Sequence, residues 1–310
     1  MKKEIYRIDI HHHIVPPIYL SSLARFNITK VSSSSFPNWN PEQSLELMDR
    51  QNIAIALTSI STPGIFFGDI DFTKNLARLC NNYLADLIRK HPKRFGGFAV
   101  LPIPDYEASL QELEYALDKL KLDGVGMLTN INGKYVGDPE YNDLFAELNK
   151  RNSVVFIHPN SPPDEKLPNL SFPASTLEFV FDTTRAIANL LYNDIFKKYQ
   201  NIKFIFAHAG GTAPYIVWRI SFGNKKLRKF FRNLYYDTAL SATKSVFRSL
   251  MELVDISHIL FGSDYPFVHE IVVKEMIQLI ADNQDFDEES RFMIEQNNAL
   301  SLFPRLRSYL

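Results

Sequence analysis

Short apolar segments typical of β-strands alternate with helix-like segments along all 310 residues of the chain. The predicted strands cover residues 5–10, 53–60, 95–101, 124–128, 153–158, 203–208, 234–238 and 257–262. The predicted helices cover residues 41–51, 70–91, 107–120, 140–151, 183–199, 212–222, 242–254, 269–282 and 287–303. Strands separated by helices in this way predict an α/β fold, specifically a (β/α)8 TIM barrel. An open doubly wound sheet is the alternative, but no glycine-rich dinucleotide turn follows the first strand.

Two segments interrupt this alternation and should distort the barrel. Residues 14–38 form an insertion after the first strand, and residues 159–182 follow the fifth. The chain length suits a single barrel domain over residues 1–310. Long loops at the carboxyl ends of barrel strands commonly serve function, so we expect both insertions to cover the active-site face. Surface loops without a role are the alternative.

The first predicted strand ends in Asp9-Ile10-His11-His12-His13. Because residues two apart in a strand share a face, His11 and His13 should project together while His12 points away. Two imidazoles side by side suit a borderline metal ion such as zinc. By the same spacing Asp9 should share the face of His11. It either orients a metal ligand or accepts a structural hydrogen bond.

Three later strands also end in polar residues. His158 follows residues 153–157, His208 follows residues 202–207, and Asp264 follows residues 258–263. Singly, each fits a polar strand cap or a turn. In a parallel barrel, however, the carboxyl ends of the strands converge on the face that carries the active site.

Together these residues predict a metal centre with chemistry beside it. His11, His13, His158 and Asp264 would supply three nitrogens and one oxygen, leaving a position open for water or substrate. His208 would remain as an acid–base group, so the expected catalytic residues are His208 and Asp264. The fourth strand ends in Met127-Leu128-Thr129 without a lysine that could bridge two metals. We therefore expect one divalent metal per chain, zinc first and manganese as the alternative.

Four ordered motifs resemble the amidohydrolase superfamily, in particular its decarboxylase branch, over nearly the whole chain. That branch includes decarboxylases of aminocarboxymuconate semialdehyde, hydroxybenzoates and 6-methylsalicylate. The motifs are Asp9-Ile-His11-His12-His13, Phe156-Ile-His158-Pro159, Phe206-Ala-His208-Ala-Gly-Gly211 and Phe261-Gly-Ser-Asp264-Tyr-Pro-Phe267. The resemblance implies the same four metal ligands and a catalytic His208. It also implies that Arg219 holds a substrate carboxylate from a neighbouring subunit, and hence a homodimer.

Other candidate substrate-binding residues are Arg185, for a carboxylate, and Phe66 and Phe67, whose flat faces suit an aromatic ring. Tyr19 and Phe26 lie in the first insertion and could add to this surface. Ser44 stands where the aminocarboxymuconate enzymes carry an arginine for a second carboxylate. That departure favours a monocarboxylate as the substrate.

Composition excludes several other classes. The 34 basic and 35 acidic residues nearly balance, and no basic stripe favours nucleic acid. The chain lacks an apolar stretch of about 18 residues and the apolar region of a secretory signal, so a membrane is not expected. The single cysteine, Cys80, has apolar neighbours at helical spacing and fits a buried thiol in a reducing, cytoplasmic setting.

We therefore expect a metal-dependent, non-oxidative decarboxylase (a carboxy-lyase) of a small aromatic or enol-like carboxylic acid such as 6-methylsalicylate or another hydroxybenzoate. The alternative is a hydrolase of a lactone or amide that uses metal-activated water, because fold and metal do not fix the reaction. A non-catalytic barrel is a third interpretation, and the intact ligand set counts against it.

Overall fold

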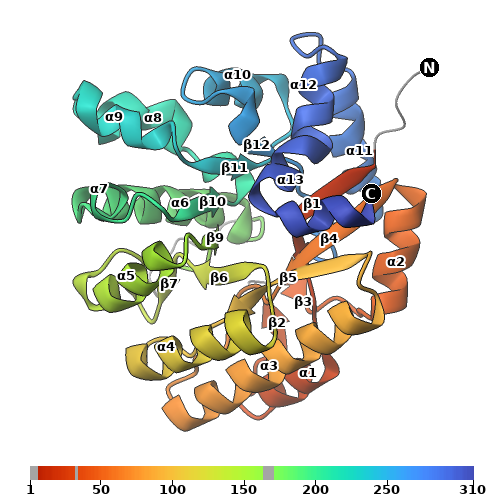
Figure 1. The fold of residues 1–310 in the computed structure, drawn as a ribbon, viewed down its shortest axis with the longest axis vertical. Helices are drawn as coiled ribbons and strands as arrows, with labels where there is room; N and C mark the ends of the chain where they lie inside the picture. Colours follow the sequence, from red (N-terminus) through yellow and green to blue (C-terminus); the bar gives the residue numbers. More distant parts are fainter. Residues whose placement is uncertain (1–5, 32–33, 163–170) are drawn as a thin grey trace.

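The computed structural model describes residues 6–31, 34–162 and 171–310, and eight parallel strands form its main sheet (Figure 1). The neighbour order is β1-β4-β5-β6-β9-β10-β11-β12, so each strand pairs with the strand that follows it in this sheet in chain order. The expected (β/α)8 barrel is confirmed. Its strands are β1 (Arg7–His13), β4 (Ile53–Ser59), β5 (Phe95–Val100), β6 (Gly124–Leu128), β9 (Val154–His158), β10 (Lys203–Phe206), β11 (Tyr235–Asp237) and β12 (Ile259–Leu260).

The barrel closes through irregular backbone rather than a regular ladder. Strand β12 has only two residues, and the chain beyond it continues along β1. The Ile10 amide donates to the Phe261 carbonyl (3.0 Å), the Asp264 amide to the His11 carbonyl (2.7 Å), and the His13 amide to the Tyr265 carbonyl (2.7 Å). This seam fixes Asp264 beside the first strand.

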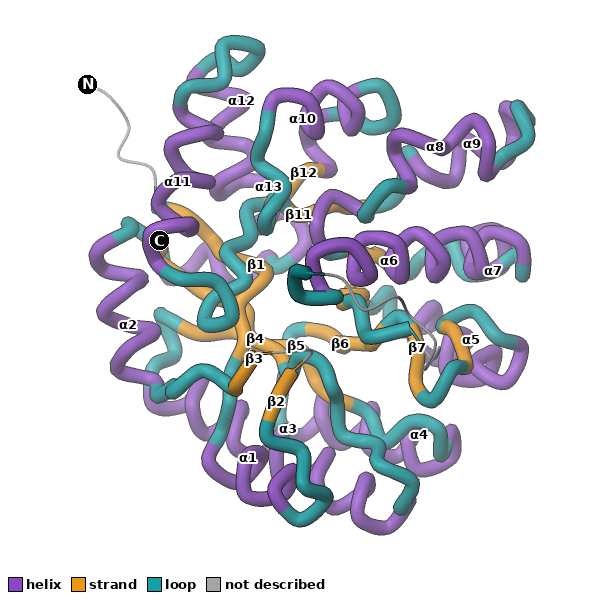
Figure 2. Tube along the Cα trace, turned by 180° about the vertical axis from the view of Figure 1, so that it is seen from behind, coloured by secondary structure: helices purple, strands orange, loops and turns teal. Residues whose placement is uncertain are grey.

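Helices surround the strands on the outside (Figure 2). No helix in the described part of the chain is both long enough and apolar enough to cross a membrane. The helices are α1 (Pro17–Ala24), α2 (Pro41–Arg50), α3 (Ile70–Lys90), α4 (Tyr106–Glu114), α5 (Asn142–Lys150), α6 (Ser175–Tyr192), α7 (Ile195–Lys198), α8 (Ala213–Ile220), α9 (Lys225–Phe231), α10 (Lys244–Met251), α11 (Glu270–Ala281), α12 (Glu288–Phe292) and α13 (Asn298–Leu302).

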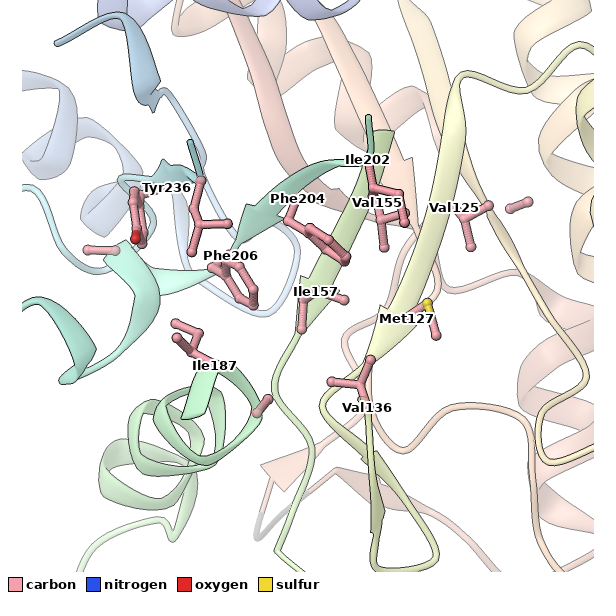
Figure 3. Packing of buried hydrophobic residues seen from close by; sticks show 14 of the residues in the cluster. Val125, Met127, Val136, Val155, Ile157, Ile187, Ile202, Phe204, Phe206 and Tyr236 are labelled. Atoms are coloured by element: carbon pink, nitrogen blue, oxygen red, sulfur yellow. The ribbon is translucent and has the colours of Figure 1, made fainter. Parts of the chain in front are cut away.

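Apolar side chains fill two layers. The barrel interior holds a small cluster that includes Ile10, Leu57, Phe98, Phe156 and Ile205. A larger cluster fills the space between strands and helices. Figure 3 shows part of it, where side chains of β6, β9 and β10 meet α6. Burial on both faces explains why these strands read as continuous apolar runs.

Both expected insertions contain regular structure. Residues 14–38 include α1 and the short hairpin of β2 (Lys30–Val31) and β3 (Ser34–Ser35). A second short hairpin, β7 (Asn130–Ile131) and β8 (Lys134–Tyr135), follows β6 and lies outside both insertions. The expected loop 159–182 is wrong at its end, because α6 begins at Ser175, although residues 163–170 lie outside the described part.

The helix expected over 183–199 is therefore wrong in its limits. Helix α6 begins after Ala174, whose side chain caps no backbone amide. It ends at Tyr192, and Asp194 adopts a left-handed conformation (φ 59°) before the short α7.

Candidate active site and metal centre

Strand β1 presents His11 and His13 to one centre while His12 points the other way, as the strand period predicts. A register shift between Asp9 and His12 changes the face on which Asp9 lies. Its Oδ2 lies 2.9 Å from His12 Nδ1 and accepts from the Ser263 hydroxyl (2.5 Å). Asp9 therefore does not share the side-chain face of His11 but acts as a buried structural acceptor.

Four potential ligand atoms, from His11, His13, His158 and Asp264, lie within 4.8 Å of one another. All four residues are buried. His11 Nε2 lies 3.0 Å from His13 Nε2 and 3.3 Å from Asp264 Oδ1, and His13 Nε2 lies 3.1 Å from the same oxygen. The structure thus brings together the residues that the sequence predicted as ligands.

The partners of the outer ring nitrogens test whether this set suits a cation. His11 Nδ1 faces Asp237 Oδ2 (2.7 Å), and His158 Nδ1 faces the Pro159 carbonyl (2.8 Å). Both partners only accept, so both Nδ1 atoms carry protons, and each ring in its neutral form directs an Nε2 lone pair at the centre. Ser59 Oγ lies 3.0 Å from His13 Nδ1 and can likewise accept a hydrogen bond from that nitrogen. Converging lone pairs beside a carboxylate fit a divalent metal.

Burial and the neighbouring charges shift the pKa values of the four residues in different directions. Burial lowers the pKa of His11, but the carboxylates of Asp237 and Asp264 more than compensate and raise it to about 10. Burial lowers the pKa of His13 to about 4, and burial beside His13 holds the pKa of His158 well below its usual value. Burial alone would raise the pKa of Asp264, yet His11 and the other histidines hold it well below normal. Two neutral imidazoles and an ionised carboxylate are therefore ready to bind metal.

His208 lies beside this centre. It follows β10, and both His208 (φ 54°) and Ala209 (φ 56°) adopt left-handed backbone conformations. His208 Nε2 lies 3.3 Å from Asp264 Oδ2, while Nδ1 is buried and has no hydrogen-bond partner among the described residues. A side chain placed against a ligand, with one nitrogen unused, suits proton transfer.

Two cavities meet at His158. The larger, of about 610 Å³, also reaches His208 and Asp264. Its walls include Ser34 and Ser35 from the first insertion and Thr176, Phe179 and Val180 from α6. The smaller cavity, of about 60 Å³, lies on the β4–β6 side and is mostly apolar, with Ile65, Phe66, Ile103, Leu128 and Ile131 in its wall.

The structure distributes the expected aromatic residues differently. Phe66 lines the small cavity, but Phe67 packs against Phe26, with ring centres 5.4 Å apart. Tyr19 is buried and donates to the Gly64 carbonyl (2.8 Å). Among the described residues, neither Phe67 nor Tyr19 lines either cavity.

Neither arginine meets a cavity within the described chain. The Arg185 guanidinium is half exposed and lies 3.8 Å from Asp182. Arg219 lies at the end of α8 on the surface. Ser44 is also away from the cavities, where its hydroxyl lies 2.9 Å from His12 Nε2 and accepts from Trp39 Nε1 (2.8 Å). Its position therefore says nothing about a second substrate carboxylate.

Sequence reasoning did not single out three residues that shape the site. Asp237 holds His11, and Phe179 and Phe267 supply aromatic surface to the large cavity. Their rings lie 6.2 Å from His158 and 5.4 Å from His13, respectively. Phe267 closes the Asp264-Tyr-Pro-Phe motif, and Asp237 is the last but one residue of the predicted strand 234–238, so both carried a usable signal.

A family model described as amidohydrolase matches residues 8–305, nearly the entire chain. The chain belongs to the amidohydrolase family. Among the relatives of this amidohydrolase is a 6-methylsalicylic acid decarboxylase from Penicillium expansum, 32% identical over 98% of this chain and 98% of that protein. A 2-amino-3-carboxymuconate-6-semialdehyde decarboxylase from Dictyostelium discoideum is 27% identical over 84% of this chain and 76% of that protein.

Solved structures share the fold. One described as amidohydrolase II superposes with a TM-score of 0.92 at 30% identity, over 96% of this chain and 99% of that chain. A dihydroxybenzoic acid decarboxylase from Polaromonas sp. JS666, solved with bound manganese, has a TM-score of 0.82 at 22% identity and covers 97% of each chain. The expected family and architecture are confirmed.

Proposed function

We propose that this amidohydrolase is a metal-dependent, non-oxidative decarboxylase of a monocarboxylic ortho-hydroxybenzoate, with 6-methylsalicylate as the first candidate substrate. The observation that carries the proposal is the complete His/His/His/Asp set with His208 beside it, on a chain alignable end to end with a 6-methylsalicylic acid decarboxylase. A cytoplasmic location, which the single buried thiol Cys80 suits, is part of the proposal.

His11, His13, His158 and Asp264 would hold one metal ion per chain. We propose zinc, which favours nitrogen-rich ligand sets, with manganese as the alternative because a structural neighbour binds it. When bound, the metal supplies positive charge that holds the substrate carboxylate and its adjacent hydroxyl. Elemental analysis of protein purified without added metal should find about one transition metal ion per chain.

His208 would supply the proton. Its imidazolium form, held against Asp264, donates to the ring carbon that bears the carboxylate. The carbon–carbon bond then breaks, carbon dioxide leaves, and the ring carbon keeps the proton. Asp264, 3.3 Å from His208 Nε2, stabilises the charged imidazole and is the alternative proton carrier.

The two cavities favour a particular substitution pattern. The large cavity has aromatic walls from Phe179 and Phe267 that suit a benzene ring. The small cavity has a mostly apolar wall, with Ser59, Asn132 and Asn160 among its polar residues, and suits a methyl-sized substituent. Burying a hydroxyl against the apolar part of this wall, away from those polar groups, costs about 1–3 kcal/mol, so 6-methylsalicylate should be preferred over 2,6-dihydroxybenzoate by roughly 5- to 150-fold in kcat/KM.

A carbon dioxide release assay on a panel of hydroxybenzoates, muconate semialdehydes, lactones and amides tests the function. Release from an ortho-hydroxybenzoate is the expected result. Hydrolysis of lactones or amides with every carboxylate left intact would replace the proposal with the hydrolase alternative. Preference for 2,6-dihydroxybenzoate would reject the substrate while keeping the reaction.

We also propose a homodimer that delivers Arg219 to a substrate carboxylate in the neighbouring subunit. Support comes from the surface around Arg219, where Tyr215, Trp218 and Phe222 are 86%, 68% and 83% exposed. Monomeric proteins rarely leave such aromatic surface uncovered. Arg219→Ala and His158→Ala chains should each be inactive alone but regain activity when co-expressed, because the mixed dimer has one intact site. Failure of this complementation with both chains folded would reject the shared site.

A further inference from the structure

Asp237 ends β11 and is completely buried. Its Oδ2 lies 2.7 Å from His11 Nδ1, and its Oδ1 accepts the backbone amides of His208 (2.9 Å) and Ala239 (3.0 Å). One carboxylate therefore contacts both a proposed ligand and the backbone of the proposed acid. We propose that Asp237 is a positioning residue that fixes the tautomer of His11 for metal binding and, separately, holds His208 in place. The second part rests on the proposed function.

The first role follows from the chemistry of the carboxylate. Ionised, it only accepts hydrogen bonds, so the neutral His11 ring keeps its proton on Nδ1. His11 Nε2 then directs its lone pair toward His13 and Asp264, at 3.0 and 3.3 Å. A donor in place of Oδ2 would favour the opposite tautomer, whose Nε2–H cannot bind metal.

The second role concerns the backbone. Left-handed conformations at His208 and Ala209 are unfavourable for residues with a side chain. The hydrogen bond from the His208 amide to Asp237 Oδ1 holds the first of them in place. Losing it lets the backbone relax and moves the ring away from Asp264.

The chain leaves room for this arrangement at Gly262, in the segment that leads to Asp264. A Cβ atom at this position would lie 2.7 Å from His11 Cβ and 3.2 Å from Asp237 Cβ. A side chain here would push the two partners apart. The close approach of His11 and Asp237 thus explains why the Phe-Gly-Ser-Asp motif has a glycine here. Gly262→Ala should weaken metal binding in the same way as loss of the Asp237 carboxylate.

Two substitutions separate the roles. In Asp237→Asn the amide oxygen should stay with the two backbone amides and turn its NH2 toward His11. Metal affinity should fall roughly 10- to 100-fold, and saturating metal should restore more turnover than it does in Asp237→Ala. Asp237→Ala should lose affinity and also stay slow at saturating metal, because His208 loses its acceptor.

Metal affinity is measured by competition with a chelating dye, independently of activity. Asp123→Asn is the matched control: the Asp123 side chain is only 3% exposed, accepts the Gly97 amide (2.8 Å) and pairs with Arg305, away from the site. Its metal affinity should not change. Unchanged affinity in Asp237→Asn would overturn the first role, and full turnover of metal-saturated Asp237→Ala would overturn the second.

A measurement on the protein without substitutions does not depend on whether the variants fold. Histidine nitrogen NMR of the zinc-loaded protein should show His11 with its proton on Nδ1, and a proton on Nε2 would overturn the first role. If affinities and tautomer behave as expected but the unaltered enzyme releases no carbon dioxide from any acid, the proposed function fails while the metal-positioning role stands.

Discussion

Asp237 and Asp182 are both completely buried carboxylates near the carboxyl ends of the barrel strands, but they receive different donors. Asp237 binds an imidazole whose second nitrogen points to the metal centre. Asp182, on α6, accepts from the hydroxyls of Thr129 and Tyr135 and from the Asn130 side-chain amide (2.9 Å). The hydroxyl and amide groups around Asp182 leave no converging lone pairs behind them.

This difference shows that burial alone does not identify a functional carboxylate. Around Asp182 the charge is satisfied by donors that tie the segment after β6 to α6, so the cluster is complete without a ligand. Around Asp237 the contacts with His11 and with the His208 amide hold two histidines whose Nε2 atoms face a shared centre, so that cluster is complete only with a cation. Substitutions of Asp237 and its partners should therefore change metal binding, whereas substitutions of Asp182 should change the free energy of unfolding.

The largest effect is expected from His158→Ala. Removing one of four ligands opens the centre, so metal and activity should be lost together. Metal content after dialysis and turnover of the same sample are the measurements. His91→Ala, at the end of α3, is a control that should keep both. Retention of one metal ion per chain in His158→Ala would contradict the ligand assignment.

His208 should separate metal from catalysis. His208→Ala is expected to keep most of its metal and to lose turnover by roughly 100-fold or more. Because His208 has a positive φ, His208→Asn is a second variant that tolerates this backbone better. If either variant loses metal as completely as His158→Ala, His208 is a ligand and the assigned roles are wrong.

Metal affinity should depend on pH because Asp237 and Asp264 raise the pKa of the ligand His11. In the metal-free site His11 keeps a second proton up to its pKa of about 10, and this proton occupies the metal-facing nitrogen. Metal binding must displace it, so affinity should rise by up to about tenfold per pH unit between roughly pH 7 and 9. Calorimetry in two buffers of different ionisation enthalpy measures the protons released. Release of none at pH 8 would contradict this account.

The sequence was sufficient for the parts of the site that depend on local pattern. His11, His13, His158 and Asp264 each end an apolar run, and a parallel barrel gathers such ends on one face. The pairing of His11 with Asp237 joins residues 226 positions apart, which one sequence without homologues does not reveal. The bulge that turns Asp9 away is likewise invisible in the alternation of residues.

The substrate residues were harder to predict because they depend on a helix boundary. With α6 expected to start at residue 183, Arg185 would lie in its first turn, near the strand ends. The helix begins at Ser175 instead, so Ser175, Thr176, Phe179 and Val180 face the cavity and Arg185 lies further along. An error of about two turns in one boundary thus separates the expected position of Arg185 from the observed one, and polar and aromatic side chains of α6 line the cavity instead.

The smallest effect on the metal centre is expected from Asp182→Asn, which tests the comparison from its other side. The amide replaces one acceptor oxygen by a donor among groups that already donate, so the free energy of unfolding should fall by about 1–3 kcal/mol. Metal affinity should stay within about twofold, since no metal ligand contacts Asp182 through its side chain. Urea unfolding and dye competition on the same protein measure the two quantities. A loss of affinity as large as that of Asp237→Asn would show that the two carboxylates belong to one coupled network, and the distinction between them would be wrong.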